Sequence, residues 1–286
     1  MSSRIVFTRE IENNTPRQVA DIYIMNPDGT NLSRLTTNPP DQEWDCSGPA
    51  LSPDGSMIAF FSYLRRPGIN LSDIYVMDAS GANITRLTNG PGDNEDPAWS
   101  PTGDRIVFAG SDGSSKSALY FVNPDGTELH QLTNSRFSDY QPAWACSGGG
   151  IVFVRELSPY PDRMTELFVI NADGTGERQL TSFGGIVFEP VWSPDGSRIA
   201  FSSSPLNSVS LDICSVDATS GGSLIRHTHG GAQHFAPCYS PDGAGIVMGS
   251  NRGGSPNKIY VLDIGPGSWL QLTSGAHDDG QPDWRG

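Results

Sequence analysis

Apolar residues in this chain come in short blocks rather than at helical spacing. Runs of aliphatic, β-branched and aromatic residues, such as Ile58-Ala59-Phe60 and Ile106-Val107-Phe108, alternate with clusters of Gly, Pro, Asp and Ser. No window carries an apolar stripe at a spacing of three or four residues, so we expect almost no helix. The runs are typical of β-strands, and because they are nearly continuous we expect sheets that are covered on both faces.

The blocks recur as a unit of four runs. The first run leads into a tight turn, as in Pro190-Val191-Trp192-Ser193-Pro194-Asp195-Gly196, where Pro presets φ, Asp caps the backbone and Gly takes positive φ. The second and third runs follow, and the fourth ends in Leu-Thr, with His227-Thr228 as the one substitute. The opening prolines stand at positions 49, 97, 142, 190, 237 and 282, so the unit recurs every 45 to 48 residues.

Four strands per unit and a period of this length predict a β-propeller. The N-terminal segment supplies a second, third and fourth run without a first, and the segment at Pro282 is a first run without followers. We therefore predict an all-β fold, one domain over residues 1–286. It is a six-bladed β-propeller of four-stranded antiparallel blades, closed by the N- and C-termini sharing one blade.

The order of these elements resembles the WD-like repeats of the TolB-like β-propeller family. The resemblance rests on Trp192–Gly196, Ile199-Ala200-Phe201, Asp73–Asp78 and the Leu-Thr pairs, and it covers essentially the whole chain. It implies the fold. It implies less about function, because similar repeats occur in binding modules, in prolyl-oligopeptidase-like peptidases and in polysaccharide lyases. This sequence contains neither the N-terminal α/β domain of TolB nor the Gly-x-Ser-x-Gly motif of the peptidases.

Charge and composition narrow the class of partner. The formal net charge of −14 opposes nucleic acid, because phosphate recognition needs a basic surface. We expect no membrane span and no signal peptide, since neither an apolar run of 18 residues nor an apolar leader segment is present. As the chain stands we expect a cytoplasmic protein, or a periplasmic or secreted one if a leader was removed. The cysteines, Cys46, Cys146, Cys214 and Cys238, are expected to be small buried thiols.

The two faces of the predicted disc differ. One carries short turns that are alike from blade to blade, and we expect their acids to be turn formers: Asp28, Asp54, Asp125, Asp173, Asp195 and Asp242. The other face carries long, dissimilar loops, including Arg9–Ala20, Tyr63–Ser72, Arg155–Thr165 and the loops that lead into the innermost strands. Variable loops on a rigid scaffold commonly carry function, so we assign binding to this long-loop face.

The loops leading into the innermost strands are strongly acidic. Against a single base, Arg136, they hold ten acids: Asp41, Glu43, Asp45, Asp93, Glu95, Asp96, Asp139, Glu189, Asp278 and Asp279. Such a funnel is compatible with a solvated rim, a docking site for a basic peptide or a cation site. Oxygen ligands suit Ca²⁺ or Mg²⁺, with Asp96, Gln141, Glu189 and Gln281 as the candidate ligands. A transition-metal site at His229, His234 and His277 is a further alternative.

We therefore expect a non-catalytic, monomeric binding scaffold that recruits a protein or basic peptide around the central channel. The residues assigned to binding are Asp93, Glu95, Asp96, Gln141, Glu189, His234 and Gln281, and no catalytic residue is assigned. The alternative is a carbohydrate-active enzyme, a polysaccharide lyase or glycoside hydrolase, at the same face. In that case the cations of the outer loops could hold an acidic sugar: Arg65, Arg66, Arg155 and Arg163.

Overall fold

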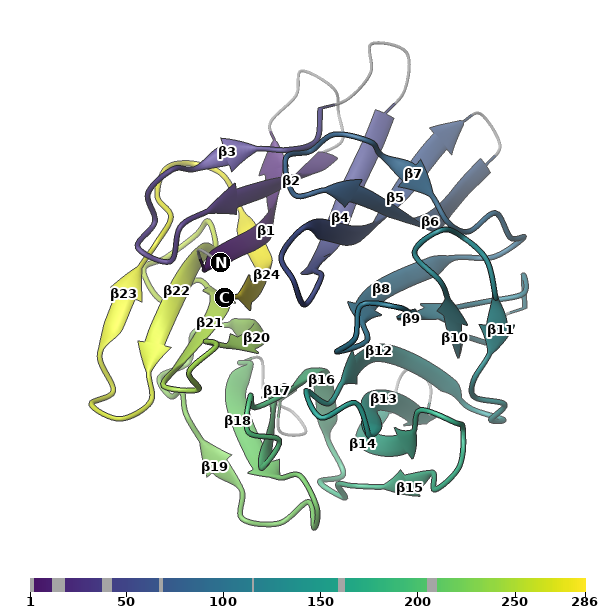
Figure 1. The fold of residues 1–286 in the computed structure, drawn as a ribbon. Coiled ribbons are helices and arrows are strands. Elements are labelled where there is room, and N and C mark those ends of the chain that lie inside the picture. The colour runs from purple at the N-terminus through teal and green to yellow at the C-terminus, as the bar shows by residue number, and fades with distance from the viewer. Residues whose placement is uncertain are drawn as a thin grey trace.

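The computed structural model describes residues 3–11, 19–37, 43–66, 69–114, 116–158, 163–204 and 210–286. Within them, four-stranded antiparallel sheets stand as six blades around a central axis (Figure 1). None of the described residues lies in a helix, and accordingly none belongs to a helix long and apolar enough to cross a membrane. The predicted six-bladed all-β propeller is confirmed.

Each blade is given from its innermost to its outermost strand. Blade 1 contains β24 (Asp279–Arg285), β1 (Arg4–Ile11), β2 (Val19–Met25) and β3 (Ser33–Arg34). Blade 2 contains β4 (Glu43–Leu51), β5 (Met57–Arg66), β6 (Ile69–Asp78) and β7 (Thr85–Arg86). Blade 3 contains β8 (Asn94–Trp99), β9 (Ile106–Gly110), β10 (Ala118–Val122) and β11 (His130–Gln131).

The second half of the ring repeats this arrangement. Blade 4 contains β12 (Ser138–Trp144), β13 (Gly150–Ser158), β14 (Met164–Asn171) and β15 (Arg178–Gln179). Blade 5 contains β16 (Ile186–Trp192), β17 (Arg198–Ser204), β18 (Asp212–Asp217) and β19 (Ile225–Arg226). Blade 6 contains β20 (His234–Tyr239), β21 (Gly245–Ser250), β22 (Lys258–Asp263) and β23 (Trp269–Gln271).

The two ends of the chain close the ring, as predicted. β24 pairs antiparallel with β1, so that Trp284 lies opposite Ile5 and Asp283 opposite Val6 (Figure 1). The Trp284 indole N–H also donates to Ser3 Oγ at 2.6 Å. Each sheet then has an inner edge strand at the central channel and an outer edge strand of two or three residues, which is too short to template pairing with another chain.

The core lies between the blades. Each hydrophobic cluster combines residues of two neighbouring blades, as where Val6 and Ile22 of blade 1 pack with Ile58 and Phe60 of blade 2. The last residue of the apolar triplet that each second strand carries, as in Ile58-Ala59-Phe60, is fully buried in every blade: Phe7, Phe60, Phe108, Phe153, Phe201 and Met248. The middle strands are therefore covered on both faces, which explains their nearly continuous apolar runs.

The short-turn face is held by its own side chains. The predicted turn acids accept from the backbone N–H two residues further on, at 2.9 to 3.0 Å: Asp28, Asp54, Asp125, Asp173, Asp195 and Asp242. Hydrogen bonds from Ser193 and Ser197 lower the pKa of Asp195 to about 2. The prediction that these acids are turn formers is confirmed.

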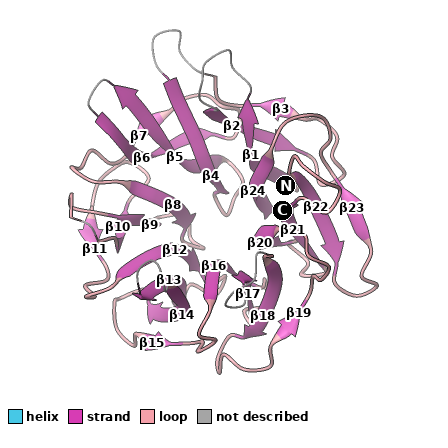
Figure 2. Ribbon diagram, turned by 180° about the vertical axis from the view of Figure 1, so that it is seen from behind, coloured by secondary structure: helices cyan, strands magenta, loops and turns pink. Residues whose placement is uncertain are grey.

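Two expectations need correction. The predicted loop Tyr63–Ser72 is largely strand, because β5 and β6 stay paired as far as Arg66 opposite Ile69, and Figure 2 shows these strands reaching beyond those of the other blades. Cys146 is exposed in the turn between β12 and β13, whereas Cys46, Cys214 and Cys238 are buried as expected. Burial raises the pKa of the Cys46 thiol to about 12 and that of Cys214 to about 11.

Candidate functional site

Six residues at one repeat position surround the central channel, and we call them the channel ring. Each lies directly before a repeat proline, and together with those prolines they line a common cavity: Gly48, Asp96, Gln141, Glu189, Ala236 and Gln281. All six have φ between 49° and 58°. The register of the innermost strand shifts at each of these sites, so the ring consists of β-bulges that turn these residues toward the axis.

Side chains of the channel ring join neighbouring blades. Gln141 Oε1 accepts from the Glu189 N–H at 3.0 Å, and Glu189 Oε2 accepts from the Ala236 N–H at 2.6 Å. Gln281 Oε1 accepts from the Gly48 N–H at 3.0 Å, and the Asp96 carboxylate accepts from the Gln141 N–H. Each acceptor therefore bonds the ring residue of the next blade. The four predicted cation ligands are brought together, with some of their oxygens used between blades.

Two channel-ring carboxyls face a confined space. Burial raises the pKa of Asp96 to about 7, and the charges of Glu95 and Glu189 add to this effect. Burial also raises the pKa of Glu189, against the hydrogen bonds that it accepts from Ala236 and Ser202. A cation in the channel would favour the charged form of both groups. Within the described ranges, however, no three or more His, Cys, Asp or Glu side chains are grouped to hold a metal ion.

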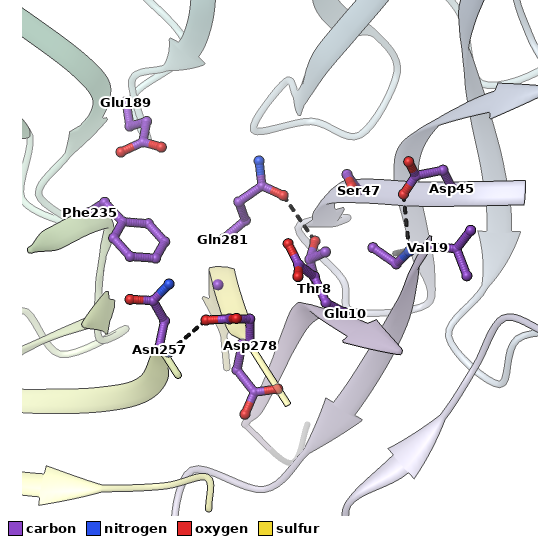
Figure 3. A pocket seen from close by; sticks show the side chains of 13 residues that line it. Thr8, Glu10, Val19, Asp45, Ser47, Glu189, Phe235, Asn257, Asp278 and Gln281 are labelled. Carbon is purple, nitrogen blue, oxygen red and sulfur yellow. Dashed lines mark hydrogen bonds between the residues drawn. The ribbon is translucent and has the colours of Figure 1, made fainter. Parts of the chain in front are cut away.

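A second cavity, of about 460 Å³, opens beside the channel, and we call it the acidic pocket. Its lining comes from blades 1, 2, 5 and 6, and includes the carboxylates Glu10, Asp45, Glu189, Asp278 and Asp279. Figure 3 shows most of these side chains around one space, with Thr8, Phe235, Asn257 and Gln281. Glu189 and Gln281 belong to both cavities, so the acidic pocket and the channel ring are continuous.

The carboxylates of the acidic pocket differ in their partners. Asp45 Oδ1 accepts from the Ala20 N–H at 3.0 Å, and Asp278 Oδ1 accepts from the Asn257 N–H at 2.7 Å. Asp279 is paired with Arg9. Burial raises the pKa of Glu10, and the nearby charges of Asp278 and Asp45 raise it further. Among the described residues that line the pocket none is a Lys or Arg, so its lining carries an excess of negative charge.

Three residues assigned to binding from the sequence lie elsewhere. Asp93 Oδ1 accepts from the Ser72 N–H at 3.0 Å, and Glu95 accepts from the hydroxyls of Tyr63 and Ser72, so both hold the β6 strand. His234 is 2% exposed and its Nδ1 lies 2.9 Å from Ser250 Oγ. Burial lowers the pKa of His234. None of these three lines the channel or the acidic pocket.

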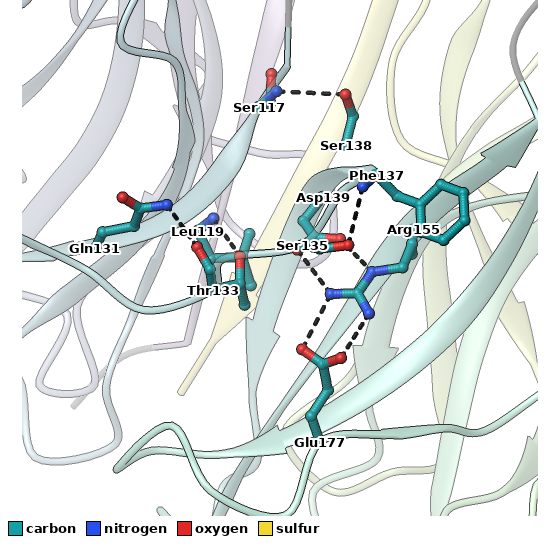
Figure 4. Close-up of polar contacts among 10 residues, drawn as sticks. All are labelled: Ser117, Leu119, Gln131, Thr133, Ser135, Phe137, Ser138, Asp139, Arg155 and Glu177. Atoms are coloured by element: carbon teal, nitrogen blue, oxygen red, sulfur yellow. Dashed lines mark hydrogen bonds and ion pairs between the residues drawn. The ribbon is translucent and has the colours of Figure 1, made fainter.

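The predicted funnel also loses two of its ten charges. Asp139 and Asp279 are buried against Arg155 and Arg9, each with a carboxylate oxygen 2.6 Å from the arginine Nε. Arg155 further binds Glu177 through two hydrogen bonds (Figure 4). Arg163 pairs with Glu156 at 2.9 Å. Asp41 and the side chains of Glu43, Arg65 and Arg66 lie outside the described residues.

The sequence did not single out Glu10, Thr8, Phe235 or Asn257 as pocket residues. Glu10 is the penultimate residue of β1, the second strand of blade 1, whereas Phe235 and Asn257 belong to blade 6 and are more than 220 positions away. One signal was available, since Glu10 falls in the long loop predicted from Arg9 to Ala20. Only ring closure brings these residues to one cavity.

Comparison with known proteins agrees with this architecture. The TolB beta propeller domain family matches residues 41–159 and 157–285. The chain is 35% identical over 80 residues, 28% of its length, to Tol-Pal system protein TolB 1 of Novosphingobium aromaticivorans, of which the match covers 16%. The match thus spans about a sixth of the length of the curated relatives.

Solved structures share the fold at low sequence identity. TolB from Acinetobacter baumannii superposes with a TM-score of 0.79 at 20% identity, over 99% of this chain and 66% of that one. An oligogalacturonate lyase in complex with manganese superposes with a TM-score of 0.61 at 18% identity, over 95% of this chain and 73% of the lyase. The repeat, the closed six-bladed ring and the family match lead to one conclusion: this chain belongs to the TolB β-propeller family.

Proposed function

We propose that this propeller is a protein-binding scaffold that takes up a basic segment of its partner on the long-loop face, with one Lys or Arg side chain in the acidic pocket. The observation that carries the proposal is Glu10. Its carboxyl shares a cavity of about 460 Å³ with Asp45 and Asp278, and the described lining supplies no cation. An arginine side chain fits this volume, and its charge would relieve the mutual repulsion of these carboxylates.

The charge of the whole molecule supports the same class of partner. A net charge of −14 attracts basic segments over a distance and opposes acidic ones. The curated relatives are named Tol-Pal system proteins, a name that refers to a system of several proteins. This supports a protein partner, although the shared segment is a small part of those relatives.

A bound cation is a second element of the proposal. Ca²⁺ or Mg²⁺ would lie between the carboxylates of Asp96 and Glu189, with amide oxygens of Gln141 or Gln281 as further ligands. The raised pKa of both carboxyls supports it, because a cation would offset the cost of holding two negative charges in the channel. Asp93, Glu95 and His234 are not part of this proposal, since their side chains are engaged away from the channel.

We do not adopt the carbohydrate-active alternative. Arg155 and Arg163 both pair with carboxylates of this chain, so neither is available to an acidic sugar. The lining of the acidic pocket would also repel a uronate.

A charge-matched pair of variants tests the docking site. The first, Glu10→Gln with Asp278→Asn, removes two charges from the acidic pocket and keeps the acceptor for the Asn257 N–H. The control, Asp125→Asn with Asp173→Asn, removes two charges from the short-turn face.

The probe is a fluorescent peptide with one Arg between Gly and Ser residues, and its binding is followed by fluorescence anisotropy at physiological salt. We expect the pocket variant to bind at least about tenfold more weakly than wild type and the control to bind as wild type does. Equal weakening in both variants, or none in either, would refute docking in the pocket.

A further inference from the structure

The first turn of blade 4 lacks a side-chain acceptor that its counterparts have. In the other four complete turns the opening serine Oγ accepts from the backbone N–H five residues on, at 2.8 to 3.1 Å: Met57, Arg105, Arg198 and Gly245. Blade 4 has Ala145 at the serine position. The Gly150 N–H therefore lacks the opening serine hydroxyl that its counterparts bond.

The same turn also lacks a carboxylate. Asp54, Asp195 and Asp242 each accept from the N–H two residues on, at 3.0 Å, and Asp104 bonds the turn serine in blade 3. Blade 4 has Ser147 and Gly149 at these two positions. The Gly149 N–H thus lacks the carboxylate acceptor found in blades 2, 5 and 6, and the Gly150 N–H lacks the serine acceptor found in blades 2, 3, 5 and 6.

These two glycines line a cavity of about 280 Å³ between blades 4 and 5. Trp192, Thr219 and Arg178 also line it, and it opens on the short-turn face, away from the channel mouth. Arg178 stands where the other blades have no arginine or lysine: Ser33, Thr85, His130, Ile225 and Leu270. The cavity therefore combines backbone donors, a cation and an aromatic wall.

The charge of Arg178 is not neutralised by its neighbour in the sequence. Glu177 is held by Arg155 at 2.6 and 3.0 Å (Figure 4), and the guanidinium of Arg178 makes one long hydrogen bond, 3.4 Å, to the Ala218 carbonyl. The acids of the surrounding turns are bonded within those turns: Asp173 to Thr175, Asp195 to Ser197 and Asp217 to Ser220.

We propose that this cavity binds a small carboxylate. One carboxylate oxygen would accept from the N–H groups of Gly149 and Gly150, in the place that an aspartate oxygen takes in the other turns, and the other oxygen would face Arg178. The body of the ligand would lie against Trp192. The aspartates of blades 2, 5 and 6 are the template for this assignment, because they place a carboxylate on the equivalent N–H group.

Amide NMR on the full chain tests the site. Acetate and benzoate are the probes, and inorganic phosphate is the comparison anion, all at constant ionic strength. We expect saturable shifts at the Gly149 and Gly150 amides and at the Trp192 indole, with benzoate binding more tightly than acetate. Arg178→Gln should weaken binding at least about tenfold. Arg136→Gln, an equal change of charge in a long loop of the opposite face, should leave it unchanged.

A second variant replaces the ligand with an internal group. Ser147→Asp restores the carboxylate of the other turns, so it should abolish binding and move the Gly149 amide toward its ligand-bound position, with the rest of the spectrum unchanged. The proposal is overturned if neither glycine amide responds to the carboxylates, if Arg178→Gln binds as wild type does, or if Ser147→Asp still binds. Phosphate binding as tight as that of acetate would contradict the assignment to carboxylates.

Discussion

At the scale of single residues, the channel ring holds side chains in a backbone conformation that they rarely adopt. Asp96, Gln141 and Glu189 have φ of 54°, 50° and 53°. A left-handed conformation costs such residues on the order of 1 kcal/mol each. The β-bulge that imposes this conformation also directs each side chain toward the next blade. There the side-chain oxygen accepts a hydrogen bond from a backbone N–H. The ring thus connects blades through hydrogen bonds as well as through apolar packing.

The raised pKa of Asp96 makes stability depend on pH. The folded value, about 7, lies above the ordinary value of 3.8, so the folded state binds the proton more tightly than the unfolded state does. The stability that this proton contributes is present in acid and is lost as pH rises through about 7. In metal-free buffer at pH 8 we expect Asp96→Asn to raise the free energy of unfolding by on the order of 1 kcal/mol, measured by urea denaturation. Below pH 4 we expect the variant and the wild type to have the same free energy of unfolding.

The same variant tests the cation. Ca²⁺ or Mg²⁺ that binds only the folded state should raise the Tm of the wild type at pH 8, and should raise that of Asp96→Asn much less. An equal Tm increase in both proteins would place the cation elsewhere. No increase with either metal would contradict the cation site in the channel.

At the scale of the elements, two blades share a device that joins their first and second strands. Arg9 of β1 bonds Asp279 of β24 with Nε–Oδ1 at 2.6 Å, and Arg155 of β13 bonds Asp139 of β12 at the same distance. Both guanidinium groups lie over aromatic rings, that of Arg9 over Phe7 and Tyr23. The two pairs differ in one respect, because Arg155 also has Glu177 as a partner.

This difference predicts unequal mutational costs. Removing one partner of a buried pair leaves an uncompensated charge, which typically costs about 3–5 kcal/mol. We expect Asp279→Ala to approach that range, since among the described residues Asp279 is the carboxylate that Arg9 contacts. Asp139→Ala should cost clearly less, because Glu177 still compensates Arg155. Urea unfolding followed by circular dichroism compares the two. Equal destabilisation by the two substitutions would show that Glu177 does not compensate the charge of Arg155.

At the scale of the whole molecule, stability depends on closure. Blade 1 is continuous in sequence with blade 2 after β3 and with blade 6 before β24, so the ring is closed by the pairing of β24 with β1 rather than by a covalent bond. Trp284 packs in the cluster between blades 6 and 1, together with Ile5 and Phe7. If β24 separates from β1, the apolar clusters on both sides of blade 1, against blade 6 and against blade 2, become exposed to water.

Deletion of residues 281–286 tests this dependence. It removes most of β24 and exposes part of the apolar cluster around Ile5, so we expect a large fall in Tm, or failure to accumulate folded protein. A synthetic peptide of residues 279–286 added in excess should restore part of the Tm. Leu270→Ser, on the exposed outer strand β23, is the control and should leave Tm within about 2 °C of wild type. A deletion that melts at the wild-type temperature would contradict closure by this strand.

The sequence alone determined the number of blades, the shared blade at the termini, the turn acids and the position that became the channel ring. Strand runs, turn residues and the spacing of the repeats are local properties of the sequence, and successive repeats show the same pattern. Tertiary structure alone decided which acids meet a cation and which meet another acid. Asp139 and Asp279 meet arginines, His234 turns into blade 6, and Glu10 meets Asp278 from the other end of the chain. Contacts of this kind depend on packing between distant segments, and no local pattern of residues encodes them.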